Sequence, residues 1–215
     1  MWTKICGFRD VADLRLMTPL HSDAIGLNFY AQSVRYVAPE MAAAIVREMS
    51  PGMTAVAVFV NASVAEMLAI TQHVGIDVIQ LHGDESIETA GRLSDAGRRV
   101  IRAIRIDSQT GFAPVASAVT AYERAGIPLW ACLVDAAVSG SFGGTGKTVP
   151  GTLVRDWPAN YPPLILAGGL TPETVASAIQ DVRPFGVDVA SGVELSPGKK
   201  DPRQMQQFLA AAIKL

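Results

Sequence analysis

Residues 164–172 read Leu-Ile-Leu-Ala-Gly-Gly-Leu-Thr-Pro, and residues 187–194 read Val-Asp-Val-Ala-Ser-Gly-Val-Glu. Each stretch is a short apolar run that leads into a segment containing glycine. Short runs of this kind are typical of strands that are buried on both faces, as in a parallel sheet. Thr171 precedes Pro172, an order that predicts a helix start because proline lacks an N–H that a first turn leaves unpaired. The two stretches therefore predict strands that are followed by helices.

Apolar runs of this kind recur along the whole chain. Longer segments with amphipathic spacing separate them, so that predicted strands and helices alternate. Dividing 215 residues by eight runs gives about 27 residues per unit, close to the roughly 30 residues of a strand–helix repeat. The runs are residues 2–6, 24–30, 54–60, 77–81, 100–106, 129–134, 164–167 and 187–190.

The uniformity of these units decides between two α/β architectures. Repeated strand–helix units form either a closed (β/α)8 TIM barrel or a doubly wound open sheet. No Gly-x-Gly-x-x-Gly follows the first run, which counts against a dinucleotide-binding open sheet. We therefore expect a single barrel domain over residues 1–215, shorter than the roughly 250 residues that are typical of this fold.

Helix-start signals lie between the apolar runs. Ser63 and Glu66 match a capping box, in which both side chains satisfy N–H groups of the first turn. Asp201 before Pro202 predicts another helix start. Further helical patterns begin at Asp10, Pro39 and Glu85 and cover residues 109–124, whereas residues 148–157 fit no element clearly.

The composition excludes several classes of protein. With 18 basic and 20 acidic residues and a pI near 5.9, the chain has no positive surplus for nucleic acid or an anionic membrane. No apolar stretch reaches the roughly 18 residues of a membrane helix, and the N-terminal residues lack the apolar region of a signal peptide. Two cysteines make no disulfide framework, so we expect a cytoplasmic protein, either monomer or homodimer.

Polar and glycine residues gather at the C-terminal ends of the predicted strands. In a (β/α)8 barrel these ends form the face that carries the active site. The residues there are Cys6, Asn28, Tyr30, Arg35, Asn61, His82, Asp84, Arg105, Asp135, Gly168, Gly169, Ser191 and Gly192. We therefore expect a functional site at this face.

Two glycine segments predict that this site binds a phosphate group. Gly168 and Gly169 follow the seventh run, and Ser191 and Gly192 follow the eighth. Glycine lets backbone N–H groups approach an anion, and a helix N-terminus adds a favourable dipole. Many barrels bind a substrate phosphate with the loops after strands seven and eight. Tight turns between strand and helix are the alternative interpretation.

A third glycine segment, at residues 143–148, resembles a nucleotide-binding P-loop. That motif requires glycine five residues before its Gly-Lys pair, but Ser141 occupies this position. Pro150 and Gly151 follow where the motif requires a helix. The spacing excludes an NTPase and favours a glycine loop, with Gly144 in it, that closes over a phosphorylated substrate.

Cys6 and Asp135 are the candidate base and acid. Lys4 stands two residues before Cys6, so both side chains are predicted to face the barrel interior. An ordinary thiol has a pKa near 8.5, so Cys6 requires a nearby cation or a helix N-terminus to act as a base, with Lys4 and Arg9 as the candidate cations. Cys132 lies three residues before Asp135 and is predicted to face the helices. Strands one and six lie roughly across the barrel mouth, an arrangement suited to one base and one acid.

Four other polar residues complete the predicted site. Arg35 can hold a carboxylate bidentately, with an exposed surface arginine as the alternative. His82 is expected to support the mouth through hydrogen bonds, and Lys4 is expected to pair with Asp188 inside the barrel. No group of His, Cys and Asp residues has the spacing of metal ligands, so no metal is expected.

In this order, the segments resemble the phosphoribosylanthranilate isomerase family over essentially the whole chain. The first matching segment is Lys-Ile-Cys-Gly at residues 4–7. The others are residues 26–30, 33–36, 58–61, 80–85, 133–135, 143–148, 166–172, 187–194 and 197–201. Two departures are small: Val34 stands where the family more often has proline, and Ala190 stands where serine is frequent.

The resemblance implies an Amadori rearrangement in tryptophan biosynthesis. N-(5-phosphoribosyl)anthranilate would become 1-(2-carboxyphenylamino)-1-deoxyribulose 5-phosphate without a cofactor. Cys6 would be the general base and Asp135 the general acid, while Arg35 would hold the anthranilate carboxylate and the glycine segments the phosphate. Indole-3-glycerol-phosphate synthase is an alternative that would need catalytic lysine and glutamate at strand ends. A barrel that only binds phosphorylated metabolites is the alternative outside enzymes.

Overall fold

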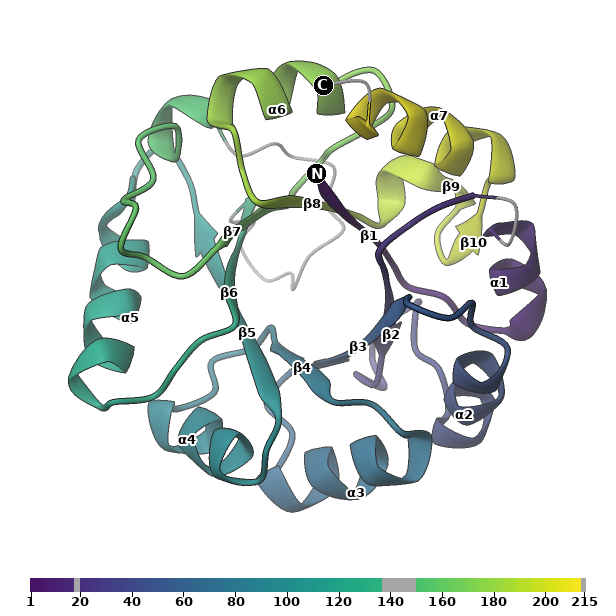
Figure 1. Cartoon of the computed structure of the whole chain (residues 1–215), viewed down its shortest axis with the longest axis horizontal. Coiled ribbons are helices and arrows are strands. Elements are labelled where there is room, and N and C mark those ends of the chain that lie inside the picture. The colour runs from purple at the N-terminus through teal and green to yellow at the C-terminus, as the bar shows by residue number, and fades with distance from the viewer. Residues whose placement is uncertain (18–19, 137–149, 214–215) are drawn as a thin grey trace.

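The computed structural model describes residues 1–17, 20–136 and 150–213. Eight parallel strands follow one another around a closed barrel, and β1 pairs with both β2 and β8 to complete it (Figure 1). The strands are β1 (Trp2–Cys6), β2 (Ala24–Asn28), β3 (Thr54–Phe59), β4 (Val78–Leu81), β5 (Arg99–Ile106), β6 (Ala131–Ala136), β7 (Leu164–Leu166) and β8 (Gly186–Val189). The predicted TIM barrel is therefore confirmed.

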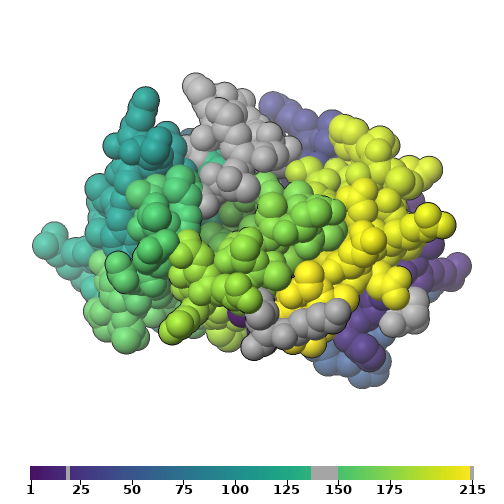
Figure 2. Space-filling model, turned by 90° about the horizontal axis from the view of Figure 1, so that it is seen from above, coloured from purple at the N-terminus to yellow at the C-terminus, as the bar shows by residue number. Residues whose placement is uncertain are grey.

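Helices form an outer ring around these strands (Figure 1). They are α1 (Val11–Met17), α2 (Pro39–Arg47), α3 (Val64–Val74), α4 (Ile87–Asp95), α5 (Ala113–Arg124), α6 (Val175–Val182) and α7 (Pro202–Ile213). Seen from the side, α6 and α7 cover the barrel wall next to each other (Figure 2). The described residues between β6 and β7 contain a 3-10 turn, η1 (Gly151–Leu153). None of the described helices is long and apolar enough to span a bilayer.

Two predicted helix caps are confirmed. The Ser63 hydroxyl accepts a hydrogen bond from the Glu66 N–H (3.2 Å) at the start of α3. The Asp201 carboxylate accepts one from the Arg203 N–H (2.8 Å) at the start of α7. Such side-chain acceptors satisfy N–H groups that have no partner inside the helix.

Three predicted helix starts were wrong because local turns intervene. Thr171 does not cap α6; its N–H donates to the Thr174 hydroxyl (3.0 Å) in a turn, and the helix begins at Val175. The Ser86 hydroxyl rather than Glu85 caps α4. The predicted helix over 109–124 begins only at Ala113, because the Asp107 carboxylate accepts N–H groups of a preceding turn.

The barrel interior is filled separately from the layer between strands and helices. Small and branched aliphatic side chains such as Ala24, Val56 and Leu133 fill the interior, packed against Trp2 and Trp130. A larger apolar layer joins the outer faces of the strands to the helices. Because the interior packing ends in the tryptophans at the N-terminal ends of β1 and β6, the opposite end is left for polar side chains.

A short hairpin that the sequence did not predict follows β8. After a 3-10 turn, η2 (Ser191–Val193), strands β9 (Glu194–Ser196) and β10 (Lys199–Lys200) pair antiparallel before α7 begins. In Figure 1 this hairpin lies between α7 and α1, near the end of β1. It brings two charged side chains, Glu194 and Lys200, into the neighbourhood of the barrel mouth.

Candidate active site

A single pocket at the C-terminal ends of the strands contains every described residue that the sequence predicted to be catalytic or to bind substrate, whereas Asn61, Asp84 and Arg105, expected at the same face, do not line it. Its empty space, open mouth included, is about 700 Å³. The predicted residues that line it are Cys6, Arg35, His82, Asp135, Gly168, Gly169, Ser191 and Gly192. Gly144, the remaining predicted residue, lies outside the described part of the chain.

Cys6 ends β1 and is only 8% exposed. Lys4, fully buried on the same strand, forms an ion pair with Asp188 of β8 (Nζ–Oδ1 2.9 Å). The predicted pair inside the barrel is thus confirmed. Gly26 of β2 makes room for the thiol, because a Cβ at that position would overlap Cys6 Sγ.

Two buried lysines act on the Cys6 thiol. Burial raises the pKa of Cys6 above its ordinary value, while the positive charges of Lys4 and Lys200 oppose that rise. Burial would lower the pKa of Lys4, but Asp188 and Cys6 raise it overall, so Lys4 remains an ammonium group. Of the two cations proposed from sequence, Lys4 therefore contacts the thiol, whereas Arg9 is exposed and reaches Gly198.

Cys132 has no part in this site. It is completely buried in the apolar layer between strands and helices, as predicted. Burial raises its pKa to about 12, with the Arg102 charge opposing. A thiol in such surroundings stays protonated and unreactive at neutral pH.

Asp135 lies on β6 and faces His82 across the pocket. Its Oδ1 accepts a hydrogen bond from the Ala136 N–H (2.8 Å). Its Oδ2 stands 3.5 Å from His82 Nε2. Gln80, two residues before His82 on β4, contacts the other ring nitrogen, Nδ1, through its amide nitrogen (2.9 Å). An amide nitrogen only donates, and in this orientation of Gln80 the ring accepts at Nδ1, while Nε2 has no hydrogen-bond partner among the described residues.

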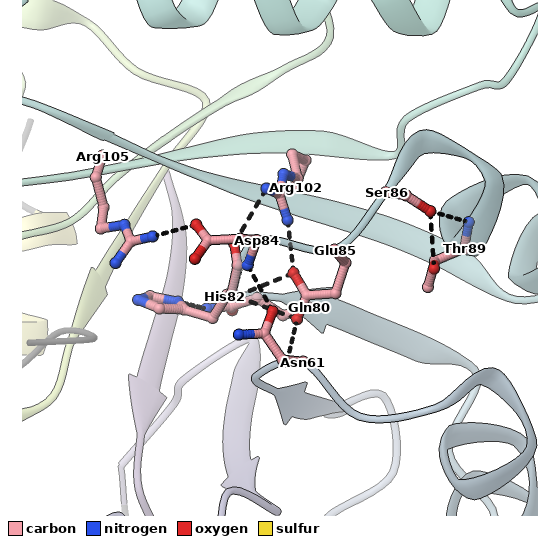
Figure 3. Close-up of polar contacts among 10 residues, drawn as sticks. Asn61, Gln80, His82, Asp84, Glu85, Ser86, Thr89, Arg102 and Arg105 are labelled. Carbon is pink, nitrogen blue, oxygen red and sulfur yellow. Dashed lines mark hydrogen bonds and ion pairs between the residues drawn. The ribbon is translucent and has the colours of Figure 1, made fainter.

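The loop that carries His82 is held by a buried carboxylate, that of Glu85 (Figure 3). Glu85 accepts the N–H groups of Gly83 (3.0 Å) and Asn61 (2.8 Å) and forms an ion pair with Arg102 of β5 (2.7 Å). Asn61, in the left-handed region at φ 54°, accepts the Asp84 N–H on its side-chain oxygen. The loop after β4 is therefore fixed by charge and hydrogen bonds from both neighbouring strands, β3 and β5.

Arg35 is already paired within the chain. Its Nε and Nη2 donate to the two carboxylate oxygens of Glu194 (2.8 and 2.7 Å). These hydrogen bonds raise the pKa of Arg35 further, although burial opposes them. Glu194 therefore occupies this edge of the guanidinium, and the bidentate grip of a ligand carboxylate by Arg35 stays a prediction. A ligand carboxylate would bind at the other edge of the guanidinium, which carries Nη1.

The glycine segments allow close packing around Asp135. Gly168 has φ 84°, and a Cβ on it would lie 2.8 Å from Asp135 Oδ1 and 2.7 Å from the Ala136 nitrogen. Gly169 also has a positive φ, of 61°. A Cβ on Gly192 would overlap the Leu170 carbonyl, so the loops after β7 and β8 touch. Only glycine permits both contacts.

Sequence reasoning missed three residues that support the site: Gln80, Glu194 and Lys200. Gln80 reads as an ordinary strand residue, although period-two spacing with His82 places both on one face. Glu194 and Lys200 lie inside segments that carried the family resemblance but were given no role there. Among the described residues, no three His, Cys, Asp or Glu side chains are arranged to hold a metal ion.

Comparison with known proteins gives one consistent result. A model of the family described as N-(5'phosphoribosyl)anthranilate (PRA) isomerase matches residues 3–211. The N-(5'-phosphoribosyl)anthranilate isomerase of Thermotoga neapolitana is 41% identical, over 97% of both chains. That of Magnetococcus marinus is 43% identical, over 97% of this chain and 93% of the relative.

Solved structures agree with the sequence matches. The phosphoribosyl anthranilate isomerase of Thermotoga maritima superposes with a TM-score of 0.88 at 34% identity, covering both chains completely. A phosphoribosyl anthranilate isomerase in complex with reduced 1-(o-carboxyphenylamino)-1-deoxyribulose 5-phosphate superposes with a TM-score of 0.85 at 33% identity, again covering both chains completely.

Proposed function

The chain belongs to the N-(5'-phosphoribosyl)anthranilate isomerase family of tryptophan biosynthesis, and from that premise we propose how its pocket isomerises N-(5-phosphoribosyl)anthranilate to 1-(2-carboxyphenylamino)-1-deoxyribulose 5-phosphate. One observation carries the proposal: Cys6 and Asp135 line the same pocket from strands on different sides of the barrel. The reaction requires a proton donor first and a proton acceptor second, and this pair supplies one of each.

Asp135 is the general acid that opens the ribose ring. Its carboxylic acid gives a proton to the ring oxygen while the bond from that oxygen to C1′ breaks. The anthranilate nitrogen supplies its lone pair to C1′, forming a protonated Schiff base. The carboxylate that results is stabilised by the Ala136 N–H, and its other oxygen lies 3.5 Å from His82 Nε2.

Cys6 is the general base of the second step. Its thiolate takes the proton from C2′, and the electrons of that bond form a C1′–C2′ double bond while the Schiff-base nitrogen becomes neutral. The resulting enolamine tautomerises to the ketone. The cations Lys4 and Lys200 favour the thiolate form that this step uses. Every proton moves between side chains and substrate, so the mechanism uses no cofactor.

The rest of the pocket orients the substrate. We assign the phosphate to Gly168, Gly169, Ser191 and Gly192. The anthranilate carboxylate lies at the free edge of the Arg35 guanidinium. Residues 1–215 act as a single domain in the cytoplasm, as monomer or homodimer. A solved relative that superposes at 33% identity consists of monomers generated from a dimeric enzyme.

A fluorescence assay tests these assignments. Phosphoribosylanthranilate is generated in situ and its loss is followed with wild type, Cys6→Ala, Asp135→Asn and the matched control Cys132→Ala. We expect wild type and Cys132→Ala to convert the substrate and the two site variants to lose about 10³-fold or more in kcat. Full activity of both site variants would remove the acid and base roles, and a folded but inactive wild type would overturn the function.

A further inference from the structure

Lys200 and Glu194 support the pocket without lining it. Lys200 is 1% exposed, and the Glu194 side chain is 3% exposed, yet neither belongs to the pocket wall. Burying a lysine is costly unless its ammonium group is fully hydrogen-bonded. The chain therefore maintains this pair at a cost, and its contacts indicate why.

The Lys200 ammonium group joins the ends of two strands. Nζ donates to the main-chain carbonyl of Cys6 (2.6 Å), to that of Ala190 (3.1 Å) and to the Glu194 carboxylate (2.8 Å). Three acceptors match the three donors that only the ammonium form has. The end of β1, which carries the base, is thus tied to the loop after β8 through one side chain.

Glu194 extends this connection to Arg35. One carboxylate oxygen receives Lys200 and Arg35 Nε, and the other receives Arg35 Nη2 and the Gly198 N–H (3.2 Å). Burial alone would raise the pKa of Glu194, but Arg35 and Lys200 lower it below its ordinary value. Glu194 is therefore an anion that fixes the plane of the Arg35 guanidinium at the pocket wall.

We propose that Lys200 and Glu194 are a positioning pair: Lys200 holds the Cys6 main chain and supplies positive charge to its thiolate, and Glu194 aims Arg35 at the substrate carboxylate. This inference rests on the proposed roles of Cys6 and Arg35. It adds two residues that touch neither the substrate nor the reacting atoms.

The balance of charge around Cys6 explains why a lysine is needed. Lys4 with Asp188 and Arg35 with Glu194 each form a neutral pair. The thiol itself is acted on by two cations, Lys4 and Lys200, and by one carboxylate, Asp188, so positive charge exceeds negative charge beside it. Burial lowers the pKa of Lys200, and the Glu194 carboxylate opposes that fall. The surplus charge favours a thiolate at Cys6.

Alkylation of Cys6 by iodoacetamide tests the charge role without requiring isomerase activity. The reagent is uncharged, so substitutions do not alter its electrostatic attraction, and peptide mass spectrometry separates Cys6 from Cys132. The rate is measured from pH 6 to 10 in wild type, Lys200→Met, Lys200→Arg and the control Lys199→Met, whose lysine is exposed. We expect Lys200→Met to react about tenfold more slowly at pH 8 because the pKa of Cys6 rises. Lys200→Arg restores most of the rate, and Lys199→Met matches wild type.

Glu194→Gln tests the second half of the proposal and does so independently of Lys200→Met. It keeps the size of the side chain but removes the charge that fixes Arg35. We expect KM for phosphoribosylanthranilate to rise about tenfold with kcat changed by less than about threefold. Alkylation of Cys6 stays as fast as in wild type or becomes faster, because a negative charge is lost.

The outcomes are distinguishable from failure of the proposed function. A folded Lys200→Met protein with the wild-type alkylation profile overturns the charge role, whether or not Cys6 is the base. An unchanged KM in Glu194→Gln overturns the aiming of Arg35. If Lys200→Met does not fold, Lys200→Arg is measured in its place. Because the arginine keeps the positive charge, an alkylation rate of Cys6 far below that of wild type contradicts the proposal. Should Cys6→Ala prove active while the alkylation shifts occur, the pair stands and the base assignment falls.

Discussion

The two sides of the barrel mouth handle charge in opposite ways. Around Cys6, two lysines are buried against the strand ends, and Lys4 and Lys200 both act on the thiol directly. Around Asp135, the partners that the structure provides are the Ala136 N–H and His82, neither of them a lysine or arginine. Arg102, on the neighbouring strand β5, forms its ion pair with Glu85 in the loop after β4.

This difference follows from what each group must do. A base works as an anion, and buried cations favour the anionic thiolate. An acid must hold its proton until the substrate takes it, and an adjacent cation would strip that proton away. On the proposed roles, the fold places fixed charge next to the base, whereas beside the acid the charged pair of Glu85 and Arg102 holds the loop after β4.

Removing the buried charge on the base side has the largest expected effect. In Lys4→Met, Asp188 would be left as a buried carboxylate without its partner. Breaking a buried ion pair in this way costs about 3–5 kcal/mol, measured as the change in free energy of unfolding in urea. The control is Arg15→Met, which breaks the exposed Arg15–Glu48 pair and should cost about 0–1 kcal/mol. Equal costs would mean that the Lys4–Asp188 pair has no special role.

How far the sequence predicts this arrangement depends on whether the residues lie on strands of regular period. The Lys4–Asp188 pair was predictable because both residues occupy strands whose period of two fixes their direction. Lys200 was not, because Pro-Gly-Lys-Lys reads as an exposed turn. Its burial arises only when the hairpin folds against the end of β1, 194 residues away in the chain.

The acid side shows the same limit at shorter range. Glu85 precedes a helical pattern, so its charge predicts the start of a helix. Its actual partners, Asn61 and Arg102, come from the neighbouring β3 and β5 sides of the barrel. The prediction that a helix starts at Thr171 was wrong for a related reason, because Thr-Pro suits a turn as well as a helix start. The barrel and the pocket residues were therefore predictable, but the groups that hold them were not.

Adding a methyl group beside the acid should damage activity more than stability. In Gly168→Ala the new Cβ would lie 2.8 Å from Asp135 Oδ1, so the carboxylate must move. We expect kcat to fall about 100-fold, since small misplacements of catalytic groups are costly. Gly97→Ala is the matched control, because Gly97 also has a positive φ of 77° but open space around it. It should share the backbone strain of about 1–3 kcal/mol and keep full kcat; equal kcat values for both variants would contradict the prediction.

Loosening the loop after β4 should have a moderate effect. Arg102→Met removes the cation from Glu85, which keeps the N–H groups of Gly83 and Asn61. We expect a loss of about 1–3 kcal/mol in the free energy of unfolding and a several-fold lower kcat, as His82 is less firmly held beside Asp135. Asp84→Asn is the control, because its pair with Arg105 lies at an exposed carboxylate. A loss of stability in Arg102→Met with kcat unchanged would separate the loop from the acid.

The pH dependence of stability tests the charge of Glu194, and its expected effect is the smallest of the four. The pKa of Glu194 is lowered in the folded protein despite burial, so the unfolded chain binds the proton more readily. The stabilisation is therefore complete above the unfolded pKa of about 4.3 and is lost as the pH falls through the folded pKa. Wild type should be more stable than Glu194→Gln at pH 6, and the difference should shrink below about pH 4.3, where the protonated glutamate resembles glutamine. Urea unfolding of both proteins from pH 6 to 3 measures this difference, with Asp107→Asn as a control for an exposed carboxylate of lowered pKa. A difference that stayed constant over the whole range would mean that Glu194 acts through its shape, and the base side of the mouth would then depend on packing rather than on charge.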